Sequence, residues 1–314
     1  MKFKASDGWV NYFMANNGFS FRRITNLTSL SPDELVRRAK CYMEYLQTAI
    51  QNGLVLQNTI LMDETAVYLE DPRRITVNAA GRRHVSLRST GFASMRNTIL
   101  LAVTASGKKL RPVIIHKKTG ESGCHFELKN GCYICYNEKA WVNGELIKKW
   151  IDLAFPPVSA ANGKALVWDS CRAHIANTVK EYMKRRGINN IVIPGGLTPY
   201  VQAGDLGIYK SFQDKISPII AAWKQSDEVE RTRGNNPKPP KIETIIKWVM
   251  SAWNQVNESV ILNSVKGAGF GDETTWHIYK HTCTGQHFEM HGFLENLLNK
   301  RKILPLTKYR KTRP

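Results

Sequence analysis

The spacing of the apolar residues changes at Leu54, and this change limits the folds that the chain can adopt. Before it, apolar residues recur every three or four positions, as they do in amphipathic helices. One helix is expected to begin after Ser6 or Asp7, and a second to run from Ser31 to Gly53. Beyond it, segments rich in β-branched residues predict strands, starting with LQNTILMDETAVYL.

The order of the later segments indicates the class of fold. The stretch NTILLAVTASGKKLRPVIIHKK predicts two strands joined by a hairpin turn at Ser106 and Gly107. After a helix at 143–154 come the strand ALVWDS, the helix NTVKEYMKRRG and the strand NIVIPGG, and further helices are expected at 206–225 and 242–256. Strand, helix and strand in succession favour an α/β domain with a partly parallel sheet.

The chain carries a large excess of positive charge. Its 45 Lys and Arg residues outnumber 26 Asp and Glu residues, which gives a formal net charge of +19. A field of this sign concentrates polyanions, and nucleic acid is the partner that best matches it inside a cell. No basic amphipathic helix with a strong apolar face stands out, so a membrane surface fits less well.

Other features of composition bear on where the protein works. No run of about 18 apolar residues exists and the N-terminal residues lack the layout of a signal peptide, so we expect a soluble protein that is not secreted. The six cysteines are thinly spread, which suits a reducing compartment and free thiols.

Two aspartates lie in segments that read as buried strands. Asp63 is in the middle of ILMDETAVYL and Asp169 is at the end of ALVWDS. A charge buried in either place costs several kcal/mol (roughly) unless it is paired, protonated or bound to metal. Asp205 follows Asp169 by 36 positions, at the expected start of a helix, and a strand, helix, strand and turn use about that length. The spacing therefore permits one shared cluster.

Three clustered carboxylates need positive charge to remain ionised, and hard oxygen ligands select Mg²⁺ or Mn²⁺. In a basic protein the natural substrate is a phosphodiester, and two such ions can assist an in-line displacement. The alternative is that each aspartate caps a helix or pairs with a cation, which is the commoner use of a lone aspartate.

The segments around these aspartates resemble the DDE endonucleases of the pogo/Tigger group of transposases, whose relatives include centromere protein B and jerky-like proteins. The matching stretches are MDET, VNAAGRRHVSLRSTG, TILLAVTASGKKLRPVIIHK, VWDSCRAH, IPGGLTPYVQAGDLGIYKSF and KWVMSAWNQVNESVILNSVKGAGF. The resemblance implies a ribonuclease H-like fold, a mixed sheet flanked by helices, in which Asp63, Asp169 and Asp205 hold two Mg²⁺ or Mn²⁺ ions. It also implies a nuclear enzyme that cuts and joins double-stranded DNA, with a homodimer on DNA as a further expectation.

The same resemblance divides the chain into four parts. Residues 1–30 resemble the last helices of a helix-turn-helix DNA-binding module, with Lys4, Arg22 and Arg23 facing phosphate and with Trp9 and Phe13 in its core. Residues 31–54 would be a linker helix, 55–270 the catalytic domain, and 271–314 a His-rich helical extension with a basic tail.

Several weaker candidates accompany the three aspartates. DNA contacts are expected from Arg82, Arg83, His174 and Lys210, although a backbone-bonded histidine and a solvated helix face are equal alternatives for the last two. Strand alternation points Glu64 away from the face of Asp63, so it is not expected to be a ligand.

Two groups of residues have zinc-ligand chemistry. The first is the C-terminal cluster of His277, His281, Cys283, His287 and His291, although Thr282, Thr284 and Gly285 break the helix that would align it. The second is the pair Cys132 and Cys135, for which the flanking tyrosines favour a plain strand.

One residue departs from the family pattern. Gly204 stands just before Asp205, where relatives usually carry leucine or an equally bulky apolar residue, and glycine there loosens a helix start. The leading hypothesis is a metal-dependent DNA endonuclease and strand transferase. Its rivals are a domesticated, inactive transposase that binds DNA or chromatin, and a ribonuclease of the same fold.

Overall fold

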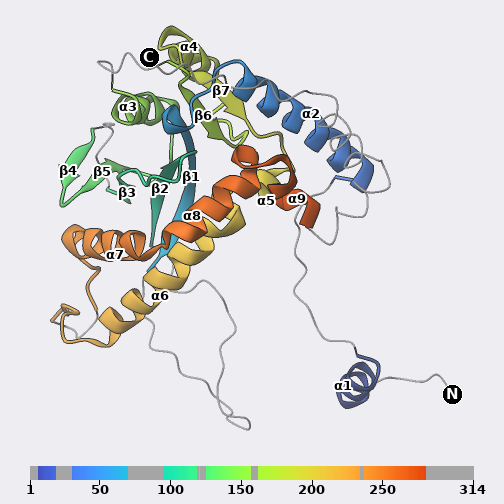
Figure 1. Cartoon of the computed structure of the whole chain (residues 1–314). Coiled ribbons are helices and arrows are strands. Elements are labelled where there is room, and N and C mark those ends of the chain that lie inside the picture. The colour runs from blue at the N-terminus through green and yellow to red at the C-terminus, as the bar shows by residue number, and fades with distance from the viewer. Residues whose placement is uncertain are drawn as a thin grey trace, which may run out of the picture.

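A mixed seven-stranded sheet lies at the centre of the computed structural model (Figure 1), which describes residues 6–18, 30–69, 95–118, 120, 125–156, 162–233 and 237–280. Within these residues the strand order is β4-β5-β3-β2-β1-β6-β7. The strands are β1 Thr59–Tyr68, β2 Arg96–Thr104, β3 Val113–Lys117, β4 Glu127–Lys129, β5 Cys132–Asn137, β6 Ala165–Trp168 and β7 Asn189–Val192.

The pairing of the strands confirms the mixed sheet that the sequence predicts. β1 runs antiparallel to β2, and β2 runs antiparallel to β3 through the short turn that follows Thr104. On its other edge β1 pairs parallel with β6, and β6 parallel with β7, since the helix α4 (Asn177–Arg185) makes the crossover.

The turn between β2 and β3 contains Gly107 with a φ of +91°, a conformation that favours glycine. A Cβ atom added there would lie 2.4 Å from Cδ2 of Leu262. Gly53, at the end of the second helix, has a φ of +94° and nothing within 4 Å of the same position. A side chain at either position would therefore meet the same backbone strain, and only the packing around the added Cβ atom would differ.

This pair gives a matched test of the hairpin's contact with the helix that carries Leu262. Gly53→Ala should lower the free energy of unfolding by about 1 kcal/mol from backbone strain alone. Gly107→Ala should cost about 2–3 kcal/mol, because the leucine must also move. Urea unfolding of both variants measures the difference, and equal losses would show that the contact is unimportant.

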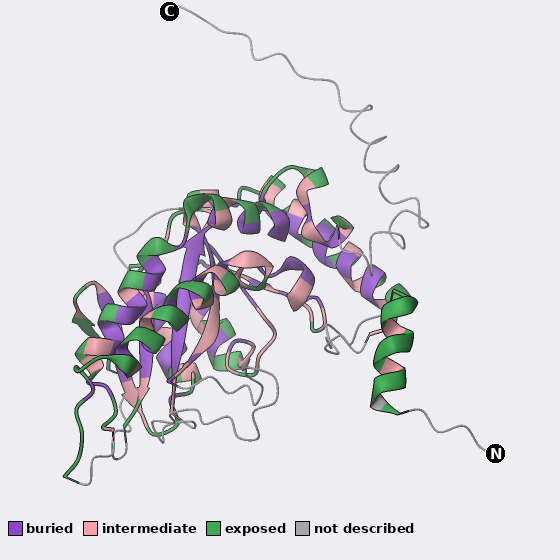
Figure 2. Ribbon diagram, turned by 90° about the horizontal axis from the view of Figure 1, so that it is seen from below, coloured by how far each residue is buried: buried purple, intermediate pink, exposed green. Residues whose placement is uncertain are grey.

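Helices cover both faces of the sheet (Figure 1). On one face α3 (Gly144–Ala154) and α4 bury residues such as Trp150 and Met183 against the sheet. The other face packs against the remaining helices of the body, and Figure 2 shows the buried residues gathered between the layers. These elements are α2 Pro32–Gln51, α5 Thr198–Val201, α6 Tyr209–Gln225, α7 Ile242–Gln255, α8 Glu258–Val265 and α9 His277–Lys280. Shorter helical turns are η1 Leu56–Asn58, η2 Gly204–Ile208, η3 Lys266–Phe270 and η4 Glu273–Thr275.

The helix α2 belongs to this body, which differs from the expectation of a linker helix. Ser31 caps it as predicted, with its Oγ accepting a hydrogen bond from the N–H of Glu34. Its apolar stripe, which includes Val36, Met43 and Leu46, is buried in the same core cluster as β1. A free linker would leave that stripe in water, and burying it stabilises the helix instead.

The first helix, α1 (Asp7–Asn16), forms where the sequence predicts it, with Ser6 as its cap. Trp9 and Phe13 stack on each other at 5.2 Å between ring centroids, and each remains 44% exposed. The expectation that they lie in a buried core is therefore wrong for the described part of the chain. Among the described residues, no helix combines the length and apolar composition that crossing a bilayer requires.

Candidate active site

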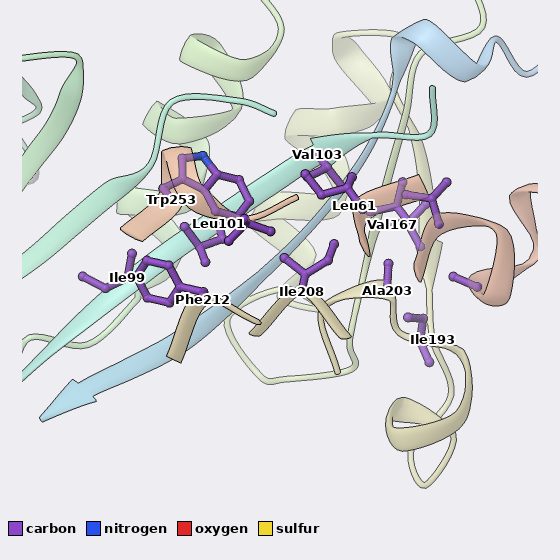
Figure 3. Close-up of a cluster of buried hydrophobic side chains, with 14 of the residues drawn as sticks. Leu61, Ile99, Leu101, Val103, Val167, Ile193, Ala203, Ile208, Phe212 and Trp253 are labelled. Atoms are coloured by element: carbon purple, nitrogen blue, oxygen red, sulfur yellow. The ribbon is translucent and has the colours of Figure 1, made fainter. Parts of the chain in front are cut away.

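The sheet and one helix start bring the three aspartates toward one region. Leu61 of β1 pairs with Val167 of β6, and Asp63 and Asp169 each follow this pair by two positions. Asp205 lies in the π-helical turn η2, which packs against β1 and leads into α6. Apolar side chains of β1, β2, β6, η2 and α6 hold this arrangement together (Figure 3).

Asp63 has the most strongly perturbed ionisation of the three. Burial of its carboxyl group raises its pKa well above the usual range, and the charges of Glu64, Asp169 and Asp205 add to this. A hydrogen bond of 2.7 Å from the N–H of Glu64 acts in the opposite direction. Asp63 is therefore held in a setting that disfavours its negative charge.

Asp205 responds to the same cluster. The residue as a whole is exposed, but protein packed around its carboxyl group and the charge of Asp169 raise its pKa to about 6. The charge of Asp169 contributes to the raised pKa of Asp63 and to that of Asp205. The charge of Asp205 also acts on Asp63, so the three aspartates lie in one region, as the spacing of the sequence permits.

His174 joins Asp169 to the neighbouring strand. Its Nδ1 lies 2.7 Å from Oδ1 of Asp169, and its Nε2 lies 3.1 Å from Oε1 of Glu64. The side chain is fully buried, and its ring stacks on Trp168 with centroids 4.4 Å apart. Both ring nitrogens are bonded and the ring is inaccessible in this structure, so the DNA contact expected of His174 stays a prediction without structural support.

The contacts of His174 with Asp169 and Glu64 fix the charges of His174 and Asp169. Burial opposes the positive charge of His174, but its hydrogen bonds with Asp169, Cys171 and Glu64 raise its pKa to about 12. Burial also raises the pKa of Asp169, and the hydrogen bonds from His174 and the N–H of Cys171 outweigh this and lower it. Asp169 therefore remains an ionised acceptor.

Glu64 reaches the site from the face of β1 opposite to that of Asp63, as strand alternation predicts. Sequence analysis missed its link to Asp169 through His174. The signal that could have revealed it is a second acid beside Asp63, since a buried acid needs a partner.

Tyr209, the first residue of α6, packs against Gly204 and also reaches the acids. It lines one small pocket together with Asp63. Burial raises the pKa of the Tyr209 hydroxyl well above its usual range, and the charges of Asp63, Glu64 and Asp205 raise it further. The phenol therefore stays neutral. Sequence analysis did not single out Tyr209, because only the tertiary structure places it beside Asp63.

The donor set fits a divalent cation with a preference for oxygen. Asp63, Asp169 and Asp205 offer carboxylate oxygens, and bound positive charge would offset the burial and the neighbouring negative charges that raise the pKa values of Asp63 and Asp205. Cys171 Sγ also lies within 4.8 Å of ligand atoms of Asp169 and His174. This second set is less suitable, because both nitrogens of His174 already bond carboxylates.

Lys210, Cys132 and Cys135, three other predicted residues, lie in the described part of the chain. Lys210 forms an exposed ion pair with Asp214 at 2.7 Å, which fits a solvated helix face. Cys132 and Cys135 lie on β5 and are buried in different core clusters, so the strand prediction holds and they do not face one metal. The four cysteines in the described residues, Cys41, Cys132, Cys135 and Cys171, are free thiols, as predicted.

Other candidates lie outside the described residues. These are the expected DNA contacts Lys4, Arg22, Arg23, Arg82 and Arg83, and the zinc-ligand candidates His281, Cys283, His287 and His291. His277 is the one member of that cluster within the described chain, at the start of α9.

Comparison with solved structures defines the class of fold. The chain is similar to the Mos1 mariner paired-end complex with Mn, with a TM-score of 0.55 and 12% identity over 89% of this chain and 71% of that one. It is also similar to a pre-cleavage Mos1 transpososome, with a TM-score of 0.54 and 12% identity over 86% and 70% of the two chains. These similarities confirm the ribonuclease H-like fold.

Sequence comparison identifies the family. The model of the family described as DDE superfamily endonuclease matches residues 94–264, more than half of the chain, and the chain belongs to this family. The human protein called pogo transposable element with KRAB domain is 27% identical over 268 residues, which are 84% of this chain. Its mouse counterpart is 26% identical over the same length. The resemblance to pogo/Tigger-type transposases is thereby confirmed, and the chain spans 44% of the length of these relatives.

Proposed function

We propose that the chain is a metal-dependent DNA endonuclease and strand transferase, with Asp63, Asp169 and Asp205 as its metal ligands and catalytic residues. The observation that carries this proposal is the placement of three aspartates from distant segments of a DDE-family chain in one region, where the charge of Asp169 acts on both Asp63 and Asp205. His174 compensates Asp169, and a bound cation would compensate Asp63 and Asp205.

Bound Mg²⁺ or Mn²⁺ ions, two in the arrangement we propose, would polarise the attacking oxygen and stabilise the leaving one at a phosphodiester. The residues of the chain prepare this site. His174 keeps Asp169 ionised and fixes its direction from a buried position. Asp63 supplies a carboxylate from the rigid centre of the sheet, and Asp205 supplies one from the more exposed turn η2.

The net charge of +19 supports double-stranded DNA as the substrate, because a basic surface attracts the phosphate backbone. One Mos1 neighbour is by its title a paired-end complex with the left transposon end, which agrees with this choice. We further propose that the protein acts in the nucleus, as a homodimer on DNA, with residues 55–270 as the catalytic domain. Residues 1–30 would then contact DNA phosphates through Lys4, Arg22 and Arg23, and the catalytic domain through Arg82, Arg83 and Lys210.

A nicking assay tests this function. Purified wild-type protein with Mn²⁺ is expected to convert supercoiled plasmid to open circles, and EDTA should stop the reaction. Asp205→Asn should lower the rate by about 10³-fold, since charge stabilisation by metal is worth several kcal/mol. Asp214→Asn, an exposed aspartate two turns further along, is the matched control and should cut like wild type. Equal nicking by the Asp205 variant would contradict the proposal.

A second candidate is an inactive transposase that holds DNA without cutting it. Gly204 favours it, because the backbone freedom of a glycine loosens the start of the helix that carries the third acid. Titration of Mn²⁺ by calorimetry distinguishes the two functions. DNA binding without measurable Mn²⁺ affinity would favour the inactive protein. A preference for cutting RNA-DNA hybrids would instead indicate a ribonuclease.

A further inference from the structure

A small pocket has Asp63 in its wall. Its volume is about 20 Å³, enough for a single water molecule, and most of its wall is apolar, with Leu61, Val167 and Ile208 among its members. Figure 3 shows several of these side chains converging between the sheet and the start of α6. The polar side chains in the wall come from Asp63, Gln202 and Tyr209.

The ring of Tyr209 occupies space that Gly204 leaves open. A Cβ atom at Gly204 would lie 2.3 Å from Cζ, 2.4 Å from Cε2 and 2.6 Å from the hydroxyl oxygen of Tyr209. Any other residue at this position would therefore force the ring to move. In this chain, glycine at position 204 leaves room for the ring of Tyr209 beside Asp63.

Gln202 supplies an independent sign that the pocket is a polar site. It is 3% exposed, and neither its amide nitrogen nor its amide oxygen has a hydrogen-bond partner among the described residues. A buried amide with no partner costs about 1–3 kcal/mol, so the pocket retains polar groups at the expense of stability. Its side chain shares the pocket wall with Asp63 and Tyr209.

We propose that Tyr209 is a positioning residue, which aims the carboxylate of Asp63 at bound metal and which only glycine at position 204 can accommodate. The inference rests on the proposed function, because it concerns the same metal site. Tyr209 and Asp63 line the same pocket, and in this role the hydroxyl would donate to the Asp63 carboxylate and limit its rotation, as partners behind metal ligands commonly do. The lone pairs left open would then bind the cation.

The test compares the Mn²⁺ affinity of the whole 314-residue wild-type chain with that of its variants by calorimetry. Tyr209→Phe keeps the ring and removes the hydroxyl, so Mn²⁺ should bind about 10-fold more weakly, as expected for loss of a hydrogen bond to a charged group. Tyr45→Phe removes a hydroxyl from a half-exposed tyrosine of α2 and should bind Mn²⁺ like wild type. The unfolding midpoint in EDTA should be the same for all three proteins.

Gly204→Ala gives a second route to the same result. The atoms it would meet are at the far end of the tyrosine, so the ring can swing away without disturbing the backbone. Mn²⁺ affinity should fall as in Tyr209→Phe, and the alanine should have no further effect in a Tyr209→Ala background. Additive losses in the double variant would contradict the coupling.

The outcomes separate the inference from the function on which it rests. If wild type and Tyr209→Phe bind Mn²⁺ equally, the role of Tyr209 is overturned whether or not the protein cuts DNA. If wild type binds Mn²⁺ without cutting and Tyr209→Phe binds it weakly, the enzyme proposal fails and the positioning role stands. If wild type binds no Mn²⁺, both are overturned.

Discussion

Asp63→Asn is expected to abolish Mn²⁺-dependent nicking and to make the metal-free protein more stable. Loss of a carboxylate ligand from the centre of the sheet should lower the cleavage rate by about 10³-fold or more. The same change removes a negative charge that burial and three neighbouring acids disfavour. The free energy of unfolding in EDTA should therefore rise by about 1 kcal/mol at pH 7.

The raised pKa of Asp63 determines how the stability gained in Asp63→Asn varies with pH. The folded-state pKa of Asp63 is raised, so the folded protein binds its proton more tightly than the unfolded chain does. The ionised carboxylate destabilises the fold above that pKa, and the penalty disappears as pH falls toward the ordinary aspartate range. The gain from Asp63→Asn should thus be present at pH 7 and absent near pH 4. Asp214→Asn, an exposed control on α6, should change neither stability nor nicking, and a destabilised Asp63 variant would contradict the electrostatic account.

His174→Ala is expected to cause the largest loss of stability in the chain's site. The substitution removes the ring between Asp169 and Glu64, and it leaves both carboxylates without this partner in a partly buried place. It also removes the stacking partner of Trp168. Breaking such a pair costs about 3 kcal/mol, measurable by urea unfolding at pH 6. His125→Ala, at an exposed position, should stay within about 0.5 kcal/mol of wild type.

The difference between wild type and His174→Ala should depend on pH. The folded-state pKa of His174 is raised to about 12, so its contribution is complete below the unfolded value near 6.5 and is lost as pH rises toward 12. The two proteins should therefore differ most at pH 6 and less at pH 9. A difference that stays constant over this range would show that packing against Trp168, rather than charge, supplies the stability.

The positions of most helices and strands could be predicted from the sequence. Caps such as Ser31 and the two apolar spacings are local signals, and they act wherever a segment ends up in the fold. The three aspartates could also be found, because an acid inside an apolar strand requires compensation. The family resemblance extended this to the ribonuclease H-like fold, which the structural comparisons confirm.

The tertiary structure decided the partners of these residues. No spacing along the chain indicates that His174 bridges two acids 110 and 5 positions away, or that α2 joins the core. Tyr209 and Gly204 are close in sequence, but their contact beside Asp63 depends on the turn η2 packing against β1. The local sequence pattern indicates what each residue requires, such as burial, a helix cap or an opposite charge. Long-range packing alone selects which distant group satisfies it, because that choice depends on the assembled sheet and helices rather than on any one segment.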